Sequence, residues 1–440
     1  MRPARRRLCW ALLAAYALFS LYAAYCVFLG PPAAARRRGR DRDRDRDPAP
    51  EHVVLGTEEW NPWEVDEKND LLQKSANSLQ LSKEMKLHKD RTDFRVQIWG
   101  KAAIGLYLWQ HIFEGPLEPA DASAQWREGS IKAGTWFFSF ITGPAVVPGY
   151  FSVETDSVVL VLNGREEGKI SYATQWLHYA QTLVQTHKLQ HVAVVLLGSE
   201  QCRNEWIYPY LKNNGGFVDL LFVIYDSPLV NEEDIFQWPL GVTTYRHFPV
   251  VEPSWSMLHA PRLYQCNFLG TVYKNSSRET LMEVLKQGGF DQRCLISARE
   301  EWWPQETNES LRNYQAALLQ SDLTLCPLGV NTECYRIYEA CALGSVPVVE
   351  DVMTPGNCGN SSMYHSAPLQ LLKTMGAPFI FIKNWKELPT VLEKEQNMTL
   401  QQKIQRRKKL MEWYRQFKAQ LRHKFISTLK NSFLSKDKGG

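Results

Sequence analysis

Almost continuously apolar runs that alternate with helical segments constrain the fold of this chain more than any other feature. The runs TWFFSFITG, DSVVLVLNG, HVAVVLLGS and GFVDLLFVIYDSP each end in small or turn-forming residues. Between the second and third lies SYATQWLHYAQTLVQTH, whose apolar residues recur at helical spacing. Strands that are apolar throughout are buried on both faces, which is typical of parallel sheets covered by helices. We therefore predict an α/β domain over residues 94–250.

A second series of the same kind follows a proline-rich crossing at residues 238–261, which we expect to be irregular. Its expected strands are YQCNFLGTVY, CLISA, LTLCPLG, VPVVED and PFIFI, separated by helices over 278–288, around SLRNYQAALLQ and around YRIYEACAL. This series predicts a second α/β domain over residues 251–390. Ligands of such sheets bind at the carboxyl ends of strands, so we expect two Rossmann-like domains facing a cleft lined by strand-end loops.

The N-terminal region predicts a membrane anchor. Residues 8–29 contain no charged side chain, and a helix of this length crosses the ~30 Å hydrocarbon core of a bilayer. The apolar run is longer than that of a cleaved signal peptide, which favours a signal anchor after a cytoplasmic tail of residues 1–7. Residues 30–93 follow as a polar stem that contains RDRDRDRD, where alternating arginines neutralise the D-x-D triplets.

The distribution of charge excludes one class of partner. Residues 1–47 hold eleven arginines and four aspartates, so the net charge of +4 for the whole chain leaves −3 for the remaining body. A slightly acidic body lacks the basic surface by which proteins bind nucleic acids.

Four N-x-S/T triplets and the cysteine count indicate a lumenal body. The triplets begin at Asn275, Asn308, Asn360 and Asn397, and they are glycosylation sites only in a chain that faces the lumen, as in a type II membrane protein. Seven of the nine cysteines lie after residue 200, which allows at most three disulfides and one free thiol. No cysteine or histidine cluster has zinc-binding spacing, so no structural metal is expected.

The segment ECYRIYEACALGSVPVVED, residues 333–351, carries the clearest chemistry. Arg336 and Glu339 lie one helical turn apart at the start of a helix that follows the expected strand LTLCPLG. A helix N-terminus attracts anions, and an arginine there can grip a diphosphate with its fork of donors. Glu339 can accept two hydroxyl hydrogen bonds, as a ribose offers, and Asp351 falls at the next strand end. The alternative is an ion pair within the helix beside a core strand.

The segments CPLG and YRIYEACALGSVPVVED resemble the exostosin-type glycosyltransferases, whose fold is the two-domain GT-B arrangement. CNFLGTVY resembles the first strand and loop of the same nucleotide-sugar domain, and the match covers about residues 265–355. The resemblance implies that Arg336 meets the donor diphosphate and Glu339 the ribose. It further implies that Gly270 lets the backbone approach the donor and that Arg278 is a second anion contact.

The chain departs from the resemblance at one point. Related transferases often have small hydroxyl residues before the arginine, where this sequence has Cys334 and Tyr335. A side-chain contact from these positions to phosphate is therefore not carried over.

Along its whole length the chain resembles Golgi type II xylosyltransferases that glycosylate α-dystroglycan. This resemblance implies inverting β1,4-transfer of xylose from UDP-xylose to ribitol 5-phosphate in the O-mannosyl glycan, with other Golgi glycosyltransferases as further partners. It also implies a Golgi membrane protein without a metal or other cofactor. In agreement, no D-x-D triplet occurs outside the stem. An arginine and a helix N-terminus would then stabilise the leaving diphosphate.

A general base for the acceptor hydroxyl is expected from the first α/β domain. Expected strand-end placement makes Asp156, Glu166, Glu167 and His178 the candidates, and the sequence does not choose among them. Two other functions stay open. One is a non-catalytic Golgi scaffold or accessory subunit with the same fold, and the other is a glycoside hydrolase, which needs two cleft carboxylates.

The C-terminal segment, residues 391–440, predicts a long basic helix. Leu410, Tyr414, Phe417, Leu421 and Phe425 form one apolar stripe at spacings of three and four. Residues 400–434 contain ten Lys or Arg against one Glu. The basic face is either the solvated side of a docked helix or a contact for an anionic substrate or a membrane surface. As a contact for an anionic acceptor, the cluster at residues 406–409 (Arg406, Arg407, Lys408 and Lys409) is expected to raise acceptor affinity.

Overall fold

The computed structural model describes residues 94–100, 102–120, 126–143, 148–149, 151–301, 307–356, 358 and 368–434, which all belong to one compact unit. The predicted cytoplasmic tail, membrane anchor and stem lie outside these residues. Within the described ranges, no helix combines the length and apolar character that crossing a bilayer requires.

The first half of the described chain builds an eight-stranded sheet with the order β2-β3-β4-β1-β5-β6-β7-β8. Its strands are β1 (Phe94–Gly100), β2 (Glu118–Pro119), β3 (Arg127–Ala133), β4 (Trp136–Thr142), β5 (Ser157–Asn163), β6 (His191–Leu197), β7 (Leu220–Ile224) and β8 (Ile235–Trp238). The central strands run parallel, as the apolar runs predict. The edge differs from the prediction, because β3 pairs antiparallel with β4, and β2 antiparallel with β3.

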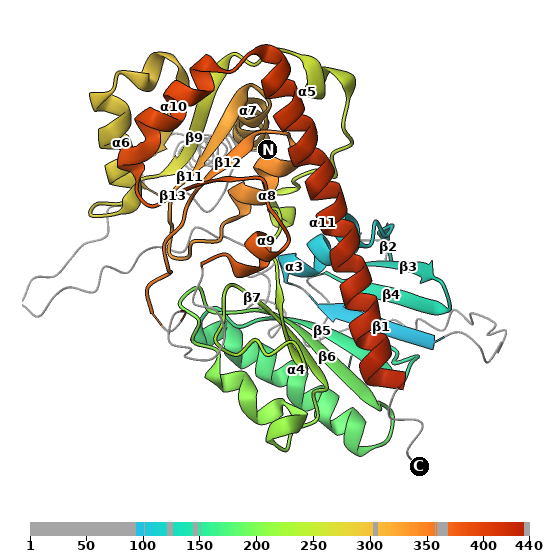
Figure 1. Cartoon of the computed structure of the whole chain (residues 1–440). Helices are drawn as coiled ribbons and strands as arrows, with labels where there is room; N and C mark the ends of the chain where they lie inside the picture. Colours follow the sequence, from blue (N-terminus) through green and yellow to red (C-terminus); the bar gives the residue numbers. More distant parts are fainter. Residues whose placement is uncertain are drawn as a thin grey trace, which may run out of the picture. The chain divides into compact units, whose positions relative to one another are not determined.

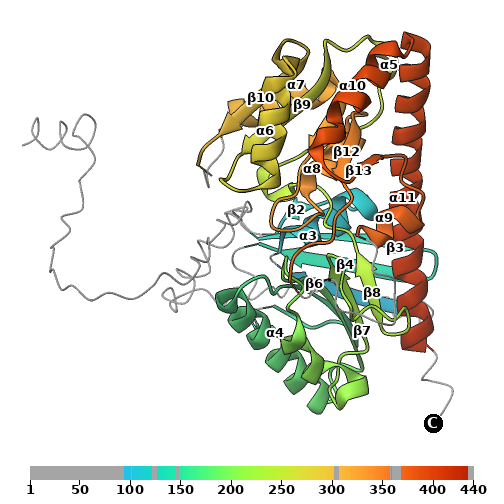
Figure 2. The same cartoon turned by 60° about the vertical axis from the view of Figure 1, so that its left-hand side comes forward.

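Helices cover both faces of this sheet. The chain continues from β1 into α3 (Ala103–Leu106) and a π-helical turn (Tyr107–Ile112), and α4 (Glu167–Gln185) connects β5 to β6. Buried Leu177 and Ala180 of α4 pack with Val158 and Leu160 of β5 on one face. Figure 2 shows α4 on this side of the sheet and the C-terminal helix α11 (Leu400–Leu434) on the other. Short 3-10 turns occur at Glu205–Tyr210, Lys212–Asn214 and Thr244–Arg246.

The second half builds a five-stranded sheet, all parallel, with the order β10-β9-β11-β12-β13. Its strands are β9 (Tyr264–Thr271), β10 (Cys294–Arg299), β11 (Ser321–Cys326), β12 (Val346–Glu350) and β13 (Ile380–Ile382). The helices are α5 (Trp255–His259), α6 (Ser277–Gln287), α7 (Asn308–Leu319), α8 (Tyr335–Ala342), α9 (Gln370–Thr374) and α10 (Leu388–Asn397), with 3-10 turns at Phe290–Gln292 and Trp385–Glu387. The prediction of two Rossmann-like α/β domains is confirmed. The crossing that was expected to be irregular contains α5.

Helix α11 joins the two sheets through its apolar stripe (Figure 1). All five predicted stripe residues are at most 5% exposed. The Tyr414 hydroxyl lies 3.3 Å from the Tyr107 hydroxyl, and the Phe425 ring packs 4.8 Å from the ring of Phe222. Full burial of each such side chain contributes about 1.5–3 kcal/mol, so this stripe is a large share of what holds the two domains together.

Two disulfides are present in the described part of the chain. Cys266–Cys294 links β9 to β10, whereas Cys202–Cys358 links the loop after β6 to the segment after β12 and so bridges the two domains. Cys326, Cys334 and Cys341 are free thiols. The second bridge closes a loop of 156 residues, a length at which cross-linking restricts the unfolded chain strongly.

Three of the four asparagines that begin N-x-S/T triplets are accessible. Asn275, Asn308 and Asn397 are exposed, and Asn360 lies outside the described residues. Glycosylation of these sites stays a prediction.

Candidate donor and acceptor site

A pocket lies where the carboxyl ends of strands from both sheets meet. Its empty volume, including space open to solvent, is about 1090 Å³. It is lined from the second sheet by the ends of β9 and β10, by α7, by the loop after β11 and by α8. The first half contributes Glu200, after β6, and the segment Thr243, Tyr245 and Arg246 that leads into the second domain. This is where parallel α/β sheets bind ligands.

Arg336 stands at the start of α8 and lines the pocket, as predicted. Its Nη2 donates to the Leu269 carbonyl at 3.0 Å, and its guanidinium lies 5.0 Å from the centre of the Phe268 ring. Burial alone would lower the pKa of Arg336, but nearby Cys334, Tyr314, Cys326 and Glu339 outweigh burial and keep it above its ordinary value. The side chain is therefore a fixed, fully charged cation in the pocket wall.

Gly270 also lines the pocket, next to Arg336. A Cβ at this position would lie 2.9 Å from Arg336 Nη2. The glycine therefore provides the space in which the Arg336 guanidinium lies. This contact explains the glycine without a direct approach of the backbone to a ligand.

Glu339 lines the pocket but is only 2% exposed, because protein donors surround its carboxylate. Oε1 accepts from the amide and the hydroxyl of Thr243, and Oε2 accepts from the Tyr314 hydroxyl at 2.5 Å. A carboxylate has about four acceptor positions, so three protein donors leave room for about one further hydroxyl. The expectation of two ribose contacts is reduced to one, and Glu339 is also a bond between the two domains.

Glu333 is a second carboxylate of the pocket wall that the sequence did not single out for a role. Its Oε1 accepts from the Leu240 amide at 2.8 Å and from the Tyr338 hydroxyl. Burial raises the pKa of Glu333 to about 8. The side chain connects α8 to the interdomain crossing.

Cys334, the residue before α8, faces the pocket where related transferases often have a hydroxyl. A hydrogen bond from the Cys326 thiol lowers the pKa of Cys334, and Arg336 and Arg278 lower it further against the effect of burial. The position therefore supplies a polarised sulfur rather than a hydroxyl.

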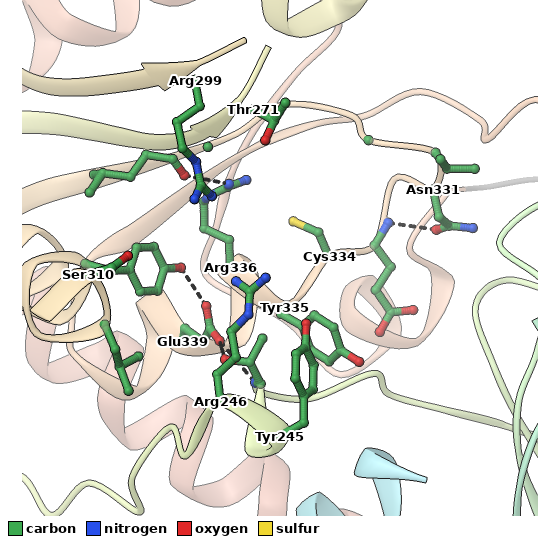
Figure 3. Close-up of a pocket in the computed structure, with 18 of the residues that line it drawn as sticks. Tyr245, Arg246, Thr271, Arg299, Ser310, Asn331, Cys334, Tyr335, Arg336 and Glu339 are labelled. Carbon is green, nitrogen blue, oxygen red and sulfur yellow. Dashed lines mark hydrogen bonds between the residues drawn. The ribbon is translucent and has the colours of Figure 1, made fainter. Parts of the chain in front are cut away.

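Two more arginines line the pocket and were missed from the sequence (Figure 3). Arg299 ends β10, and Arg246 ends the turn after Thr243 and lies 5.4 Å from the centre of the Tyr245 ring. The only sequence signal was the strand-end position of Arg299. Three guanidinium groups around one pocket favour a ligand with several negative charges. Among the described residues, no group of three or more His, Cys, Asp or Glu side chains is placed to hold a metal ion.

Two predicted donor contacts do not line the pocket. Arg278 is fully buried, and its Nη1 donates to the Thr271 carbonyl at 2.9 Å, so it supports the β9–α6 turn from behind. Burial, followed by the charge of Arg336, lowers its pKa to about 9. Asp351 does follow a strand end, but its carboxylate pairs with Lys373 and, at 2.7 Å, with Lys383. Direct donor contacts from Arg278 and Asp351 are therefore not part of this site.

The four candidate bases are also outside the pocket lining. Asp156 precedes β5, at the amino end of the parallel strands and away from the pocket, where it lines a different surface hollow. Glu166 and Glu167 are exposed at the start of α4, and His178 is exposed further along the same helix. Glu200 is the carboxylate from this domain that does line the pocket.

Two of the four residues in the basic cluster at residues 406–409 are engaged in ion pairs within the protein. Arg406 binds both oxygens of Glu395, at 2.6 and 2.7 Å. Arg407 is 2% exposed and pairs with Asp322, while Lys408 and Lys409 are exposed. No residue of α11 lines the described pocket, and Arg406 and Arg407 are engaged within the protein, so an effect of this cluster on acceptor affinity stays a prediction.

Two Rossmann-like domains that face an arginine-lined pocket define a glycosyltransferase of the GT-B arrangement. Two family models match the chain, the RXYLT1 N-terminal domain over residues 96–239 and the RXYLT1 C-terminal domain over residues 245–434. Curated proteins named ribitol-5-phosphate xylosyltransferase 1 match it along their length. The Homo sapiens protein is 65% identical over 100% of both chains, and the Danio rerio protein is 56% identical over 98% of this chain and 99% of its own.

The chain belongs to the ribitol-5-phosphate xylosyltransferase 1 family. Among solved structures, the catalytic domain of starch synthase IV from Arabidopsis thaliana, bound to ADP and acarbose, covers 77% of this chain and 99% of its own. Its identity is 8% and its TM-score 0.39, a likeness too distant to support an argument about the site.

Proposed function

We propose that the protein transfers xylose from UDP-xylose, with inversion, to ribitol 5-phosphate in the O-mannosyl glycan of α-dystroglycan. The names of the curated relatives support this choice of sugar and acceptor. The observation in the structure that carries the proposal is Arg336, held at the start of α8 by Leu269 and Phe268 and facing the pocket.

The pocket suits a reaction in which negative charge grows on a leaving diphosphate. Arg336 and the N-terminal end of α8 stabilise that charge without having to reorganise, and a partly buried site strengthens the effect. Arg299 and Arg246 add positive charge for the rest of the UDP diphosphate. They also add it for the phosphate that the acceptor carries. We propose that these groups replace a metal ion, so that catalysis needs no cofactor.

The carboxylates argue against a hydrolase. A glycosidase needs two carboxylates free to act on the scissile bond. Of the three that line the pocket, Glu333 and Glu339 already accept hydrogen bonds from protein donors. An intact arginine site likewise favours an enzyme over a non-catalytic scaffold, which has no physical need to hold a diphosphate.

The test is transfer by the purified protein from a panel of UDP-sugars to an acceptor that carries ribitol 5-phosphate, with the same glycan carrying unphosphorylated ribitol as control. We expect product only with UDP-xylose, strongly reduced without the phosphate, and a β-linkage by NMR. Preferred transfer from another UDP-sugar, or UDP binding without transfer to either acceptor, would overturn the proposal.

We also propose that residues 8–29 anchor the protein in the Golgi membrane with its body in the lumen. The exposed positions of Asn275, Asn308 and Asn397 support this orientation. Sensitivity of the cellular protein to an N-glycosidase, lost when these asparagines and Asn360 are replaced, tests the orientation. An unglycosylated body open to protease in sealed Golgi vesicles contradicts it.

A further inference from the structure

We propose that Glu200 is the general base that deprotonates the acceptor hydroxyl, an inference that rests on the proposed transfer reaction. The base must lie in the pocket and across from the donor-binding elements β9 and α8. Three carboxyl groups line the pocket in the described part of the chain. Glu333 and Glu339 come from the donor-side domain and already accept hydrogen bonds from protein donors, Glu333 through Oε1 and Glu339 through both oxygens. Glu200 comes from the opposite domain, directly after β6.

One oxygen of the Glu200 carboxylate is held by an ion pair with Arg165. Its Oε2 lies 3.1 Å from Arg165 Nη2, and the two side chains are 15% and 8% exposed. The ion pair with Arg165 uses Oε2, and we infer that Oε1 is the oxygen that meets the substrate hydroxyl. Arg165 fixes the orientation of the carboxylate without occupying both oxygens.

The backbone around Glu200 is tied to the donor-side domain. The Asn331 amide donates to the Glu200 carbonyl at 2.7 Å, and Asn331 itself lines the pocket. Two residues further on, the Cys202–Cys358 disulfide joins the same loop to the segment after β12. A base and a donor site on different domains must keep a fixed separation to within about an ångström, and these bonds provide that constraint.

The charged and titratable groups facing Glu200 come from three elements. Arg165 follows β5, Tyr273 follows β9, and Arg299 ends β10. Burial raises the pKa of Tyr273, a hydrogen bond with Thr271 and the charge of Arg299 lower it, and the charge of Glu200 raises it, so Tyr273, Arg299 and Glu200 share one electrostatic environment. Tyr273 stays a neutral phenol, which leaves the carboxylate as the proton acceptor of this cluster.

The acceptor oxygen forms a bond to C1 of xylose while the bond from C1 to the diphosphate oxygen breaks, and UDP leaves with that electron pair. The hydroxyl proton passes to Glu200 Oε1 and is later released to water. Arg336 stabilises the charge on UDP, so the two residues act at opposite ends of the same displacement.

The test compares Glu200→Gln with Glu205→Gln, an exposed glutamate a few residues further along that does not line the pocket. Glutamine keeps the size of the side chain and an oxygen towards Arg165 but cannot accept the proton. We expect Glu200→Gln to lower kcat about 10²–10⁴-fold, to leave the Kd for UDP within about twofold, and to abolish the acidic limb of the pH–kcat profile. Glu200→Asp should keep that limb at a lower kcat, and Glu205→Gln should behave as wild type.

A purely structural role for Glu200 would change the Tm and UDP binding and leave the pH profile intact. If the wild-type protein transfers xylose and Glu200→Gln retains more than about a tenth of kcat or the acidic limb, the inference about Glu200 is overturned and the proposed function stands. If the wild-type protein transfers to no acceptor, the proposed function fails first, and the role of Glu200 fails with it.

Discussion

Replacing Arg336 with alanine tests the centre of the donor site. A hydrogen bond between an arginine and a phosphate contributes about 1.5–3 kcal/mol to binding, which corresponds to a Kd for UDP about 10- to 150-fold higher in the variant. The effect on kcat should be larger, because the charge that Arg336 meets grows during the reaction. Isothermal titration with UDP and initial-rate measurements separate the two effects.

The structure also predicts what Arg336→Ala does to stability. The variant loses the hydrogen bond to Leu269 and the contact with the Phe268 ring, each worth about 1 kcal/mol. Part of this loss of stability is offset because the variant no longer places a positive charge near buried Arg278, whose pKa Arg336 helps to lower. We expect a net loss of about 1–2 kcal/mol and a decrease in Tm of a few degrees. The variant should therefore be folded when binding is measured.

Two further variants serve as controls. Arg336→Lys keeps the charge but cannot bind Leu269 and a diphosphate with one planar fork, so its UDP affinity should fall between wild type and alanine. Arg293→Ala removes an arginine of the same domain that binds Gln396 outside the pocket, and it should change neither Kd nor kcat. A folded Arg336→Ala protein with wild-type UDP affinity would refute the assignment of the donor site.

The raised pKa of Glu333 means that the folded state holds this proton more tightly than the unfolded state, so its stabilising contribution is full below about pH 4.5 and is lost as the pH rises to about 8. Glu333→Gln should flatten the fall in Tm across that range, and an unchanged slope would contradict the assignment. Transfer activity should survive EDTA, and loss of activity restored specifically by Mn²⁺ or Mg²⁺ would show that a metal is required. In urea denaturation, Arg407→Ala should cost about 1–3 kcal/mol because the carbonyls of Met257, Leu258 and Ala260 lose their donor, while Asp322 keeps its ion pair with Lys403. Lys408→Ala should change stability by less than about 0.5 kcal/mol.

The sequence predicted the sheets well wherever strands are buried on both faces. Such strands must be apolar at nearly every position, and β5 and β6 are recognisable for that reason. Strand β3, REGSIKA, has no apolar run, because every position alternates between half-buried and exposed at the sheet edge. Its pairing with β4 is decided by the tertiary structure, and local composition does not contain that information.

The donor site was predicted in part for a similar reason. Gly270, Arg336 and Glu339 lie in two short motifs at strand ends, and strand ends of parallel sheets meet at one edge. The predicted donor contact of Arg278 was wrong. Its helix, α6, begins beside the same edge of the sheet, but the Arg278 side chain points into the interior. Whether a charged residue of a helix faces a ligand or a carbonyl depends on packing that its spacing from the motif does not reveal.

The base candidates show how strongly strand direction matters. Asp156 was selected as a strand-end acid, but it precedes its strand and so lies at the wrong edge of the sheet. The same rule applied to the carboxyl end of HVAVVLLGSE leads directly to Glu200, three residues after β6. The rule holds for this residue. It does not suffice for Glu166 and Glu167, which also follow a strand, β5, but lie at the start of α4 outside the pocket lining.

The residues that shape the pocket are also those that fix the two domains relative to each other. Glu339 lines the pocket and binds Thr243 of the crossing, Glu333 binds the Leu240 amide, and Asn331 binds the Glu200 carbonyl. Hydrogen bonds of this kind contribute about 0.5–1.5 kcal/mol each, and the Cys202–Cys358 disulfide constrains the same edge of the cleft. Reopening the cleft as a rigid-body motion would break several of them together. We therefore infer that substrates enter a preformed cleft, in which folding rather than ligand-induced closure sets the separation between Glu200 and Arg336.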